Sequence, residues 1–182
     1  HMGVTAERIA ERWSLSRELQ DAYALESHRR ASAAITAGRF KDQILPIELK
    51  SKKGTVLFDT DEHVRMNATI DDMTKLRTVF QKDGTVTAGN ASGLNDAAAA
   101  TVLMERSVAE KKGLKPLARL VAYGHAGVDP KIMGIGPVPA VQNAMKRAGL
   151  TVAQMDVIES NEAFAAQSCA VARDLGFDAA KT

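Results

Sequence analysis

The middle of the chain reads Thr85-Val86-Thr87-Ala88-Gly89-Asn90-Ala91-Ser92-Gly93-Leu94-Asn95-Asp96, and an alanine-rich run follows it. Two glycines flank a short polar stretch here, which lets a ligand approach the backbone closely. The Ser92 hydroxyl has two interpretations, because it can cap a following helix or donate a hydrogen bond to such a ligand. Propensity favours a helix for the run from Ala97 to Met104. Its later half, residues 100–104, is equally compatible with a buried strand, since periodicity does not separate the two over so short a segment.

Downstream of this stretch, helical segments that end at glycines alternate with short apolar segments. Helices are expected at 107–112, 139–148 and 163–175, and strands at 118–123 and 155–158. Helices that alternate with strands are typical of a layered α/β fold, in which helices cover the faces of a sheet.

Upstream, the pattern predicts helices followed by a hairpin. A short first helix is expected, and Ser16 is a good N-cap for a longer second helix that ends at Gly38. Two short apolar runs, 44–47 and 56–58, predict an antiparallel pair of strands. Pro46 marks the first of them as an edge strand or a bulge, because proline cannot donate to a ladder.

Residues 63–84 have little periodicity apart from one predicted helical turn at 71–76. A loop of this length inside a compact protein is more often functional than decorative. We therefore interpret it as a binding surface.

Composition and charge narrow the class of protein. The 182 residues are 45% hydrophobic and 25% charged, with a net charge of +2, which is typical of a globular protein. Lys and Arg are interleaved with Asp and Glu, which argues against a nucleic-acid partner. No apolar stretch approaches the roughly 18 residues that span a bilayer, and no secretory signal opens the chain, so no membrane partner and a cytoplasmic location are expected.

The usual catalytic side chains give weak signals. The four histidines lack the spacing of metal ligands, so no metal site is expected, and His28 is interpreted as a solvated surface residue. The single cysteine, Cys169, excludes an intramolecular disulfide. It lies in an alanine-rich helix without a nearby cation and is interpreted as a buried structural thiol.

Asn161 is a stronger candidate, because it lies between the predicted strand at 155–158 and the helix at 163–175. Layered α/β proteins place ligand groups at such strand ends. A neutral amide can hold a water or stabilise developing negative charge without being protonated, which suits an oxyanion site. The alternative is that Asn161 caps the following helix.

Taken together, these blocks resemble the thiolases, and within them the bacterial acetyl-CoA acetyltransferases or β-ketothiolases. The blocks from Gly89 to Asp96 and from Asn161 to Ala165 are the most specific, and the resemblance covers essentially the whole chain. The other matches, in the expected order, are His1-Met2-Gly3, Thr5-Ala6-Glu7, Gly38-Arg39-Phe40-Lys41-Asp42, Thr85-Val86-Thr87-Ala88 and Gly136-Pro137. His1-Met2 thus has two interpretations, a native sequence or a cloning remnant.

The resemblance implies an α/β fold layered as α-β-α-β-α, of which the chain holds a part. Residues 1–88 would form most of the loop domain that covers CoA, and residues 89–182 the first part of the C-terminal βαβαβαββ half. The implied activity is acyl transfer through a cysteine acyl-enzyme, either Claisen condensation of two acyl-CoA molecules or thiolysis of a short β-ketoacyl-CoA. In the family's pattern the nucleophilic cysteine, the Gly-His-Pro histidine and the second cysteine lie outside these residues, so the chain alone is expected to be inactive.

The resemblance also implies roles for single residues. Asn161 matches the asparagine that holds a water in the oxyanion hole. Arg65 matches the arginine near the adenine and phosphate end of CoA, and Ser92 matches the serine on the pantetheine arm. The positions that line the pantetheine and acyl pocket are matched by His1, Met2, Leu76, Phe80, Met133 and Phe164. Ser160 departs from the pattern, where an alanine is expected before Asn161.

A CoA thioester is then the substrate, no further cofactor is implied, and the parent protein would be a homotetramer. Two other readings stay open. One is a non-catalytic module that binds CoA or acyl-CoA, and the other is a non-condensing or lipid-carrier-linked relative of the thiolases. The start His1-Met2-Gly3 and the Asn161 block favour the biosynthetic acetyl-CoA type over this relative.

Overall fold

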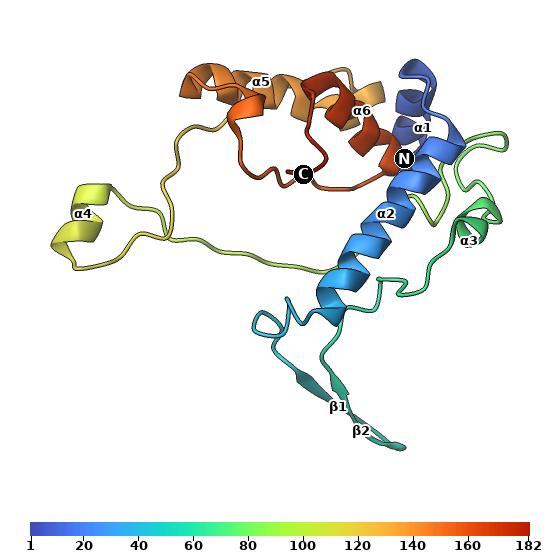
Figure 1. Ribbon diagram of the computed structural model, residues 1–182, viewed down its shortest axis with the longest axis horizontal. Helices are drawn as coiled ribbons and strands as arrows, with labels where there is room; N and C mark the ends of the chain where they lie inside the picture. The colour runs from blue at the N-terminus through green and yellow to red at the C-terminus, as the bar shows by residue number, and fades with distance from the viewer. The chain divides into compact units, whose positions relative to one another are not determined.

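The computed structural model describes all residues from His1 to Thr182, which divide into two compact units. The first unit comprises residues 1–92 and 161–170, and the second comprises residues 93–160 and 171–182. Figure 1 shows the order of helices and strands along the chain.

Two helices open the first unit, as predicted. Helix α1 spans Met2–Arg12 and α2 spans Arg17–Thr36. The Ser16 hydroxyl accepts a hydrogen bond of 3.2 Å from the backbone N–H of Leu19 and caps α2. Gly38 follows α2 with φ of +69°, a left-handed conformation that glycine adopts without a steric cost.

Small and branched apolar side chains form the core of the first unit. Ile9 on α1 and Val86 are completely buried. Ala166 and Ala170, on helix α6 (Ala165–Leu175), are completely buried as well. Because alanine adds little bulk beyond its backbone, segments that pack against this face of α6 can approach it closely.

A hairpin follows α2 and extends away from it (Figure 1). Strands β1 (Ile47–Ser51) and β2 (Gly54–Phe58) pair antiparallel, and every residue of both is exposed. The predicted pair is confirmed, but the prediction that the first strand begins at residue 44 is wrong. Pro46 has no N–H to donate to a ladder, and regular pairing begins at the next residue.

The long loop between the hairpin and residue 84 contains one short helix, α3 (Ile70–Thr74), where a single helical turn is predicted. The Thr69 hydroxyl accepts from the N–H of Asp72, and the Asp72 carboxylate accepts from the N–H of Thr69. This reciprocal capping box explains why so short a helix forms in a loop. Helix α3 packs against α2.

Two predicted helices of the second unit, α4 (Arg106–Lys111) and α5 (Pro137–Ala148), form within two residues of their expected bounds. Two 3-10 segments, η1 (Pro130–Ile135) and η2 (Val152–Gln154), are absent from the sequence predictions. The glycines predicted to end α4, α5 and α6, at positions 113, 149 and 176, have φ values of +65°, +67° and +64°.

The strands predicted at 118–123 and 155–158 do not form, and the run 97–104 is neither helix nor strand. Their apolar side chains lie open to solvent, with Leu120 65% and Val157 71% exposed. A strand exists only where another strand accepts its backbone hydrogen bonds, and neither run forms a ladder with any segment among residues 1–182. The single backbone hydrogen bond from Ile158 to the carbonyl of Lys181, 2.7 Å long, does not make one. Apolar composition alone therefore does not produce a strand.

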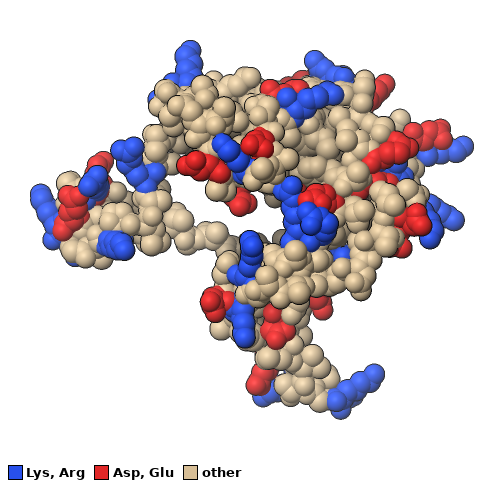
Figure 2. Space-filling model, viewed as in Figure 1, with Lys and Arg blue, Asp and Glu red and all other residues tan.

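Charges of both signs are interspersed over the face shown in Figure 2. Ion pairs one helical turn apart contribute to this pattern, such as Arg30 with Glu26 at 2.8 Å and Arg106 with Glu110 at 2.8 Å. None of the helices has both the length and the apolar character that crossing a membrane requires.

Candidate functional site

A buried carboxylate on helix α1 contacts the start of residues 85–96, which we call the central motif. Glu7 is 5% exposed and accepts hydrogen bonds from the backbone N–H of Thr85 at 2.8 Å, from the Thr85 hydroxyl at 2.9 Å and from the backbone N–H of Val86 at 2.9 Å. Hydrogen bonds to a charged acceptor are stronger than neutral ones. Glu7 thus places the segment that leads into Gly89 and Ser92.

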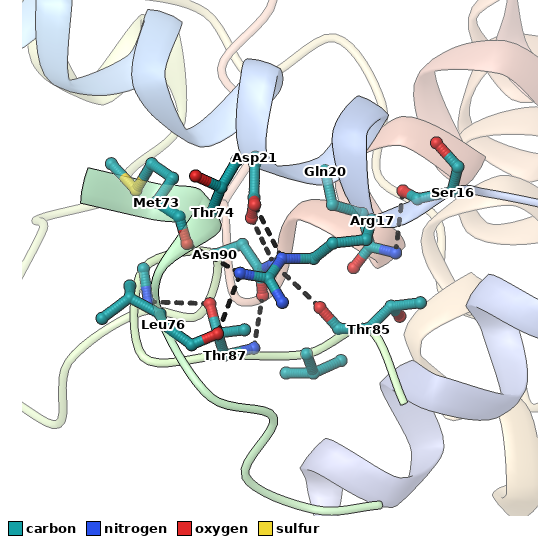
Figure 3. Close-up of polar contacts among 12 residues, drawn as sticks. Ser16, Arg17, Gln20, Asp21, Met73, Thr74, Leu76, Thr85, Thr87 and Asn90 are labelled. Carbon is teal, nitrogen blue, oxygen red and sulfur yellow. Dashed lines mark hydrogen bonds and ion pairs between the residues drawn. The ribbon is translucent and has the colours of Figure 1, made fainter. Parts of the chain in front are cut away.

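Helix α2 holds the same motif through a second buried carboxylate (Figure 3). Asp21 is completely buried and pairs with Nε of Arg17 at 2.6 Å. Its other oxygen accepts a hydrogen bond of 2.9 Å from the side-chain amide of Asn90. The Arg17 guanidinium also donates to the carbonyls of Met73 at 2.7 Å and Leu76 at 3.1 Å, which lie in and after α3.

Residues 90–92 pair with the start of α6. The carbonyl of Asn90 accepts from the N–H of Ala165 at 2.9 Å, and the N–H of Ser92 donates to the carbonyl of Ala163 at 3.1 Å. Ala91 and Phe164 form an isolated antiparallel bridge between them. The two motifs that carry the resemblance therefore lie side by side.

Ser92 and Asn161 are both exposed, and neither caps a helix. Residues 93–104 form no helix, and α6 begins at Ala165, four residues after Asn161. The capping interpretation of each residue is therefore wrong, and both side chains face solvent near the paired segments.

His1 and Phe80 form an aromatic pair at the start of α1. Their ring centroids lie 4.6 Å apart, and Nδ1 of His1 accepts a hydrogen bond of 3.1 Å from the N–H of Gly3. Phe80 packs so tightly on Gly3 that a Cβ there would overlap its ring. Met2, the next residue of the predicted pocket, is 48% exposed.

The backbone of residues 78–79 pairs with 86–87, which holds this aromatic pair beside the central motif. Leu76 lies against Gly89, where a Cβ would collide with the Leu76 side chain. The structure thus brings Leu76 and Phe80 to the same stretch of backbone, Val86 to Gly89, that leads to Ser92.

Arg65 is exposed, and its backbone N–H donates to Nδ1 of His28 at 3.2 Å. His28 is half-buried on α2, so its interpretation as a solvated surface residue is wrong. Desolvation, followed by the nearby Arg65 charge, lowers the pKa of His28, while Glu162 acts against this shift. A neutral imidazole can accept from Arg65 through its unprotonated nitrogen.

A side chain on α2 hydrogen-bonds to Glu162, the residue next to Asn161. The Ser27 hydroxyl donates to Oε2 of Glu162 at 2.6 Å. Burial, followed by the charge of Glu162, raises the pKa of Tyr23 to about 12. Tyr23 therefore keeps its proton at neutral pH.

Two further residues from the sequence predictions make none of the contacts described above. Met133 lies in η1, in the second unit, and is 49% exposed. Cys169 lies half-buried on α6, and burial raises the pKa of its thiol to about 11. A thiol that holds its proton so firmly is a poor nucleophile, which agrees with its interpretation as a structural residue.

The sequence predictions assign no role in holding the site to four side chains: Glu7, Asp21, Ser27 and His28. Glu7 enters only through a matched block and His28 only as a surface residue. Asp21 and His28 are seven residues apart on α2, a spacing that places both on one face of a helix. That spacing is the only signal the sequence offers, since their partners lie far away along the chain.

The fold and these paired motifs define a thiolase, and the chain belongs to that family. The thiolase N-terminal domain matches residues 1–107, and the thiolase C-terminal domain matches residues 114–182. The resemblance predicted from the sequence is confirmed.

The chain is similar to particular members of the family. The chain is 72% identical over 182 residues to the β-ketothiolase BktB of Cupriavidus necator, covering all of this chain and 46% of that protein. It is 54% identical over 178 residues to the acetyl-CoA acetyltransferase of Shinella zoogloeoides, covering 98% of this chain and 45% of that protein. The chain thus spans about half the length of the curated relatives it matches.

Solved structures confirm the predicted thiolase fold. The acetyl-CoA acetyltransferase of Bacillus anthracis superposes with a TM-score of 0.91 at 50% identity, and the match covers all of this chain and 46% of that one. The human mitochondrial 3-ketoacyl-CoA thiolase in complex with CoA superposes with a TM-score of 0.86 at 46% identity, covering all of this chain and 45% of that one.

Proposed function

We propose that the chain is a segment of a thiolase subunit that condenses two acyl-CoA molecules, or cleaves a short β-ketoacyl-CoA with CoA, through a cysteine acyl-enzyme. One observation carries the proposal. Residues 90–92 pair with 163–165, so that Ser92 lies beside the segment that bears Asn161. The 72% identity to a β-ketothiolase supports it. Residues 1–88 would act as the loop domain and residues 89–182 as the start of the C-terminal half.

Asn161 would supply part of the oxyanion hole. Claisen chemistry on a thioester places negative charge on the carbonyl oxygen, and a donor positioned for that charge lowers the barrier. A neutral amide donates directly or through a held water, at any pH near neutrality. The thiolate and the groups that move protons would come from outside these residues.

The other candidate side chains would bind CoA. Ser92 has a hydroxyl that can donate to or accept from the amides of the pantetheine arm. Arg65 carries a charge suited to a phosphate. The apolar members, Leu76, Phe80 and Phe164, would cover the arm and exclude water. Met133 and the pair His1-Met2 would complete this lining.

A chimera tests the proposal. The chain replaces the matching 46% of the Cupriavidus necator β-ketothiolase, with the intact enzyme and the same enzyme lacking that segment as controls. Thiolysis of acetoacetyl-CoA by CoA is measured. We expect the chimera to keep kcat within about tenfold of the intact enzyme, equivalent to a barrier change under ~1.4 kcal/mol. A chimera that folds and assembles but has no thiolysis activity contradicts the proposal.

The same assay on the chain alone tests its expected inactivity. Covalent acyl transfer needs a thiolate and a base, and Cys169 is not a poised nucleophile. We expect no turnover. Thioester cleavage by the chain alone at a rate comparable with the intact enzyme would contradict the assignment of the nucleophile to a missing segment.

A second candidate is a module that binds CoA without chemistry. One observation favours it, because nearly all of the proposed CoA contacts, Met133 apart, lie in the first unit, which has its own core. Calorimetry with CoA on the chain alone separates the two. Tight binding supports the module, and the lack of binding supports a segment that needs the rest of its subunit.

The complete subunit is proposed to act as a cytoplasmic homotetramer, with CoA thioesters as substrates and no further cofactor. Sedimentation of the chimera checks the assembly, and a dimer or monomer at micromolar concentration would contradict it.

A further inference from the structure

Asp21 is a buried carboxylate that has no role in the proposed acyl transfer. Its side chain is completely buried on α2, and its two carboxylate oxygens face different partners. One oxygen accepts from Arg17 and the other from Asn90 (Figure 3). Removing a carboxylate from water is costly, and an apolar pair of similar volume often stabilises a fold as well or better. Stability alone is therefore a weak explanation for this arrangement.

The Asn90 side chain is held by three hydrogen bonds. Its amide nitrogen donates to Asp21 at 2.9 Å and to the carbonyl of Thr85 at 3.0 Å. Its side-chain oxygen accepts from the N–H of Thr87 at 2.8 Å. The residue is 3% exposed, so no water competes freely for these groups. The rotamer of Asn90 is thereby set by partners on both sides.

The backbone of Asn90 is connected by hydrogen bonds to the start of α6, and the same segment carries Ser92. The Asn90 carbonyl receives the N–H of Ala165, and two residues later the N–H of Ser92 donates to Ala163. A shift at Asn90 therefore moves Ser92 and also loosens the start of α6.

On the other side of Asp21, Arg17 reaches the loop that carries Leu76. Its guanidinium donates to the carbonyls of Met73 and Leu76, and the Leu76 side chain lies against Gly89. Asp21 fixes the orientation of the Arg17 guanidinium. Because the guanidinium is rigid and planar, a rotation would break both of its hydrogen bonds to these carbonyls.

We propose that Asp21 is a positioning residue of the CoA-thioester site. Through Asn90 it sets the place of Ser92, and through Arg17 it sets the place of Leu76, so both sides of the pantetheine arm depend on one carboxylate. The inference rests on the proposed function. Since Ser92 and Leu76 would bind the arm while the reacting atoms lie elsewhere, loss of Asp21 weakens CoA binding more than it slows the chemical step.

The chimera carrying Asp21→Asn, Asn90→Asp or both tests this inference. Asp21→Asn places an amide opposite the amide of Asn90, and Asn90→Asp places two carboxylates together in a buried site. The double exchange restores one donor and one acceptor across the pair. Glu110→Gln, which breaks an exposed ion pair of the same spacing on α4, is the matched control.

We expect Asp21→Asn to raise KM for CoA by about tenfold, as for the loss of one charged hydrogen bond, with kcat changed by less than about threefold. The double exchange recovers part of that loss, and Glu110→Gln leaves KM unchanged. Asp21→Glu keeps the charge but moves the carboxylate by one methylene, and it raises KM even if Asp21→Asn does not fold. Unchanged KM in a folded Asp21 variant overturns the inference.

Amide hydrogen exchange provides a readout that does not need activity. In Asp21→Asn, exchange at residues 90–92 and 163–165 becomes faster than in the unaltered chimera, and Glu110→Gln leaves it the same. Unchanged protection in those two segments overturns the inference. An unaltered chimera without turnover overturns the proposed function instead, while the exchange result still decides whether Asp21 positions these segments.

Discussion

The Ser27 hydroxyl donates a hydrogen bond of 2.6 Å to Oε2 of Glu162, joining the middle of α2 to the segment that bears Asn161. The charge of the same carboxylate contributes to the raised pKa of Tyr23 on the same helix. The residue beside the proposed oxyanion donor is thus held from α2 by the Ser27 hydroxyl.

Replacing Ser27 by Ala should lower kcat of the chimera about threefold to tenfold, since one hydrogen bond to a carboxylate is lost. Ser27→Thr retains the hydroxyl and should keep most of the rate. Steady-state thiolysis with saturating CoA measures kcat directly. Equal rates in the Ala and Thr variants and the unaltered chimera would show that the contact does not position Asn161.

Asn161→Ala removes the proposed oxyanion donor itself. Loss of one such donor lowers kcat by about 10²–10³, with a smaller effect on KM. Asn143→Ala on α5, which loses only one exposed hydrogen bond to the carbonyl of His125, is the control and should remain near the unaltered rate. An unchanged kcat for Asn161→Ala would remove Asn161 from the mechanism.

His28 should make stability depend on pH. Its pKa is lowered in the folded chain, chiefly by desolvation, so the unfolded chain binds the proton at a higher pH. The contribution of neutral His28 to stability is complete above its pKa in the unfolded chain, about 6.5. It is lost as the pH falls through the lower pKa of His28 in the folded chain. Thermal unfolding at about pH 7.5 and pH 5 should show a smaller loss of Tm in His28→Gln than in the unaltered chain.

His63→Gln, at an exposed histidine in the long loop, is the control for this experiment and should lose as much Tm as the unaltered chain. If His28→Gln also does so, the lowered pKa of His28 contributes nothing to the acid sensitivity.

Gly3→Ala should destabilise the chain, because the added Cβ overlaps the Phe80 ring that stacks on His1. Overpacking of this kind costs about 1–3 kcal/mol. The free energy of unfolding in urea measures it. Gly127→Ala is the matched control, since a Cβ there meets no atom within 4 Å, and its effect should be within about 0.5 kcal/mol. Equal effects of both substitutions would show that Phe80 moves aside freely.

Cys169 should react slowly with iodoacetamide. Burial raises the pKa of its thiol from 9.0 to about 11, which lowers the thiolate fraction near neutral pH by about 10²-fold. As this is the only cysteine, mass spectrometry follows the reaction without ambiguity. Alkylation in the folded chain at the rate found in urea would contradict the burial of this residue.

Local signals predicted the local structure well. Ser16 and Gly38 mark the ends of α2, and the glycines at 113, 149 and 176 follow helices as expected. Caps and left-handed glycines act within one or two turns, so a short window of sequence contains all of the information they need.

Signals that depend on distant partners failed. The runs at 118–123 and 155–158 have the composition of strands, but a ladder needs a second segment, and none pairs with them. The residues that hold the candidate site were missed for a similar reason. Glu7 meets Val86 at a separation of 79 residues, and Asp21 meets Asn90 at 69.

The same separations bear on the order of folding. Contacts that span 69 to 135 positions require large loops to close, and loop closure of this kind slows folding relative to local helix formation. Helices α1 and α2 are synthesised before the partners of Glu7, Asp21 and Ser27, which lie at positions 85–90 and 162. During synthesis the carboxylates of Glu7 and Asp21 therefore remain hydrated until residues 85–90 have been made, and the Ser27 hydroxyl until Glu162 has been made.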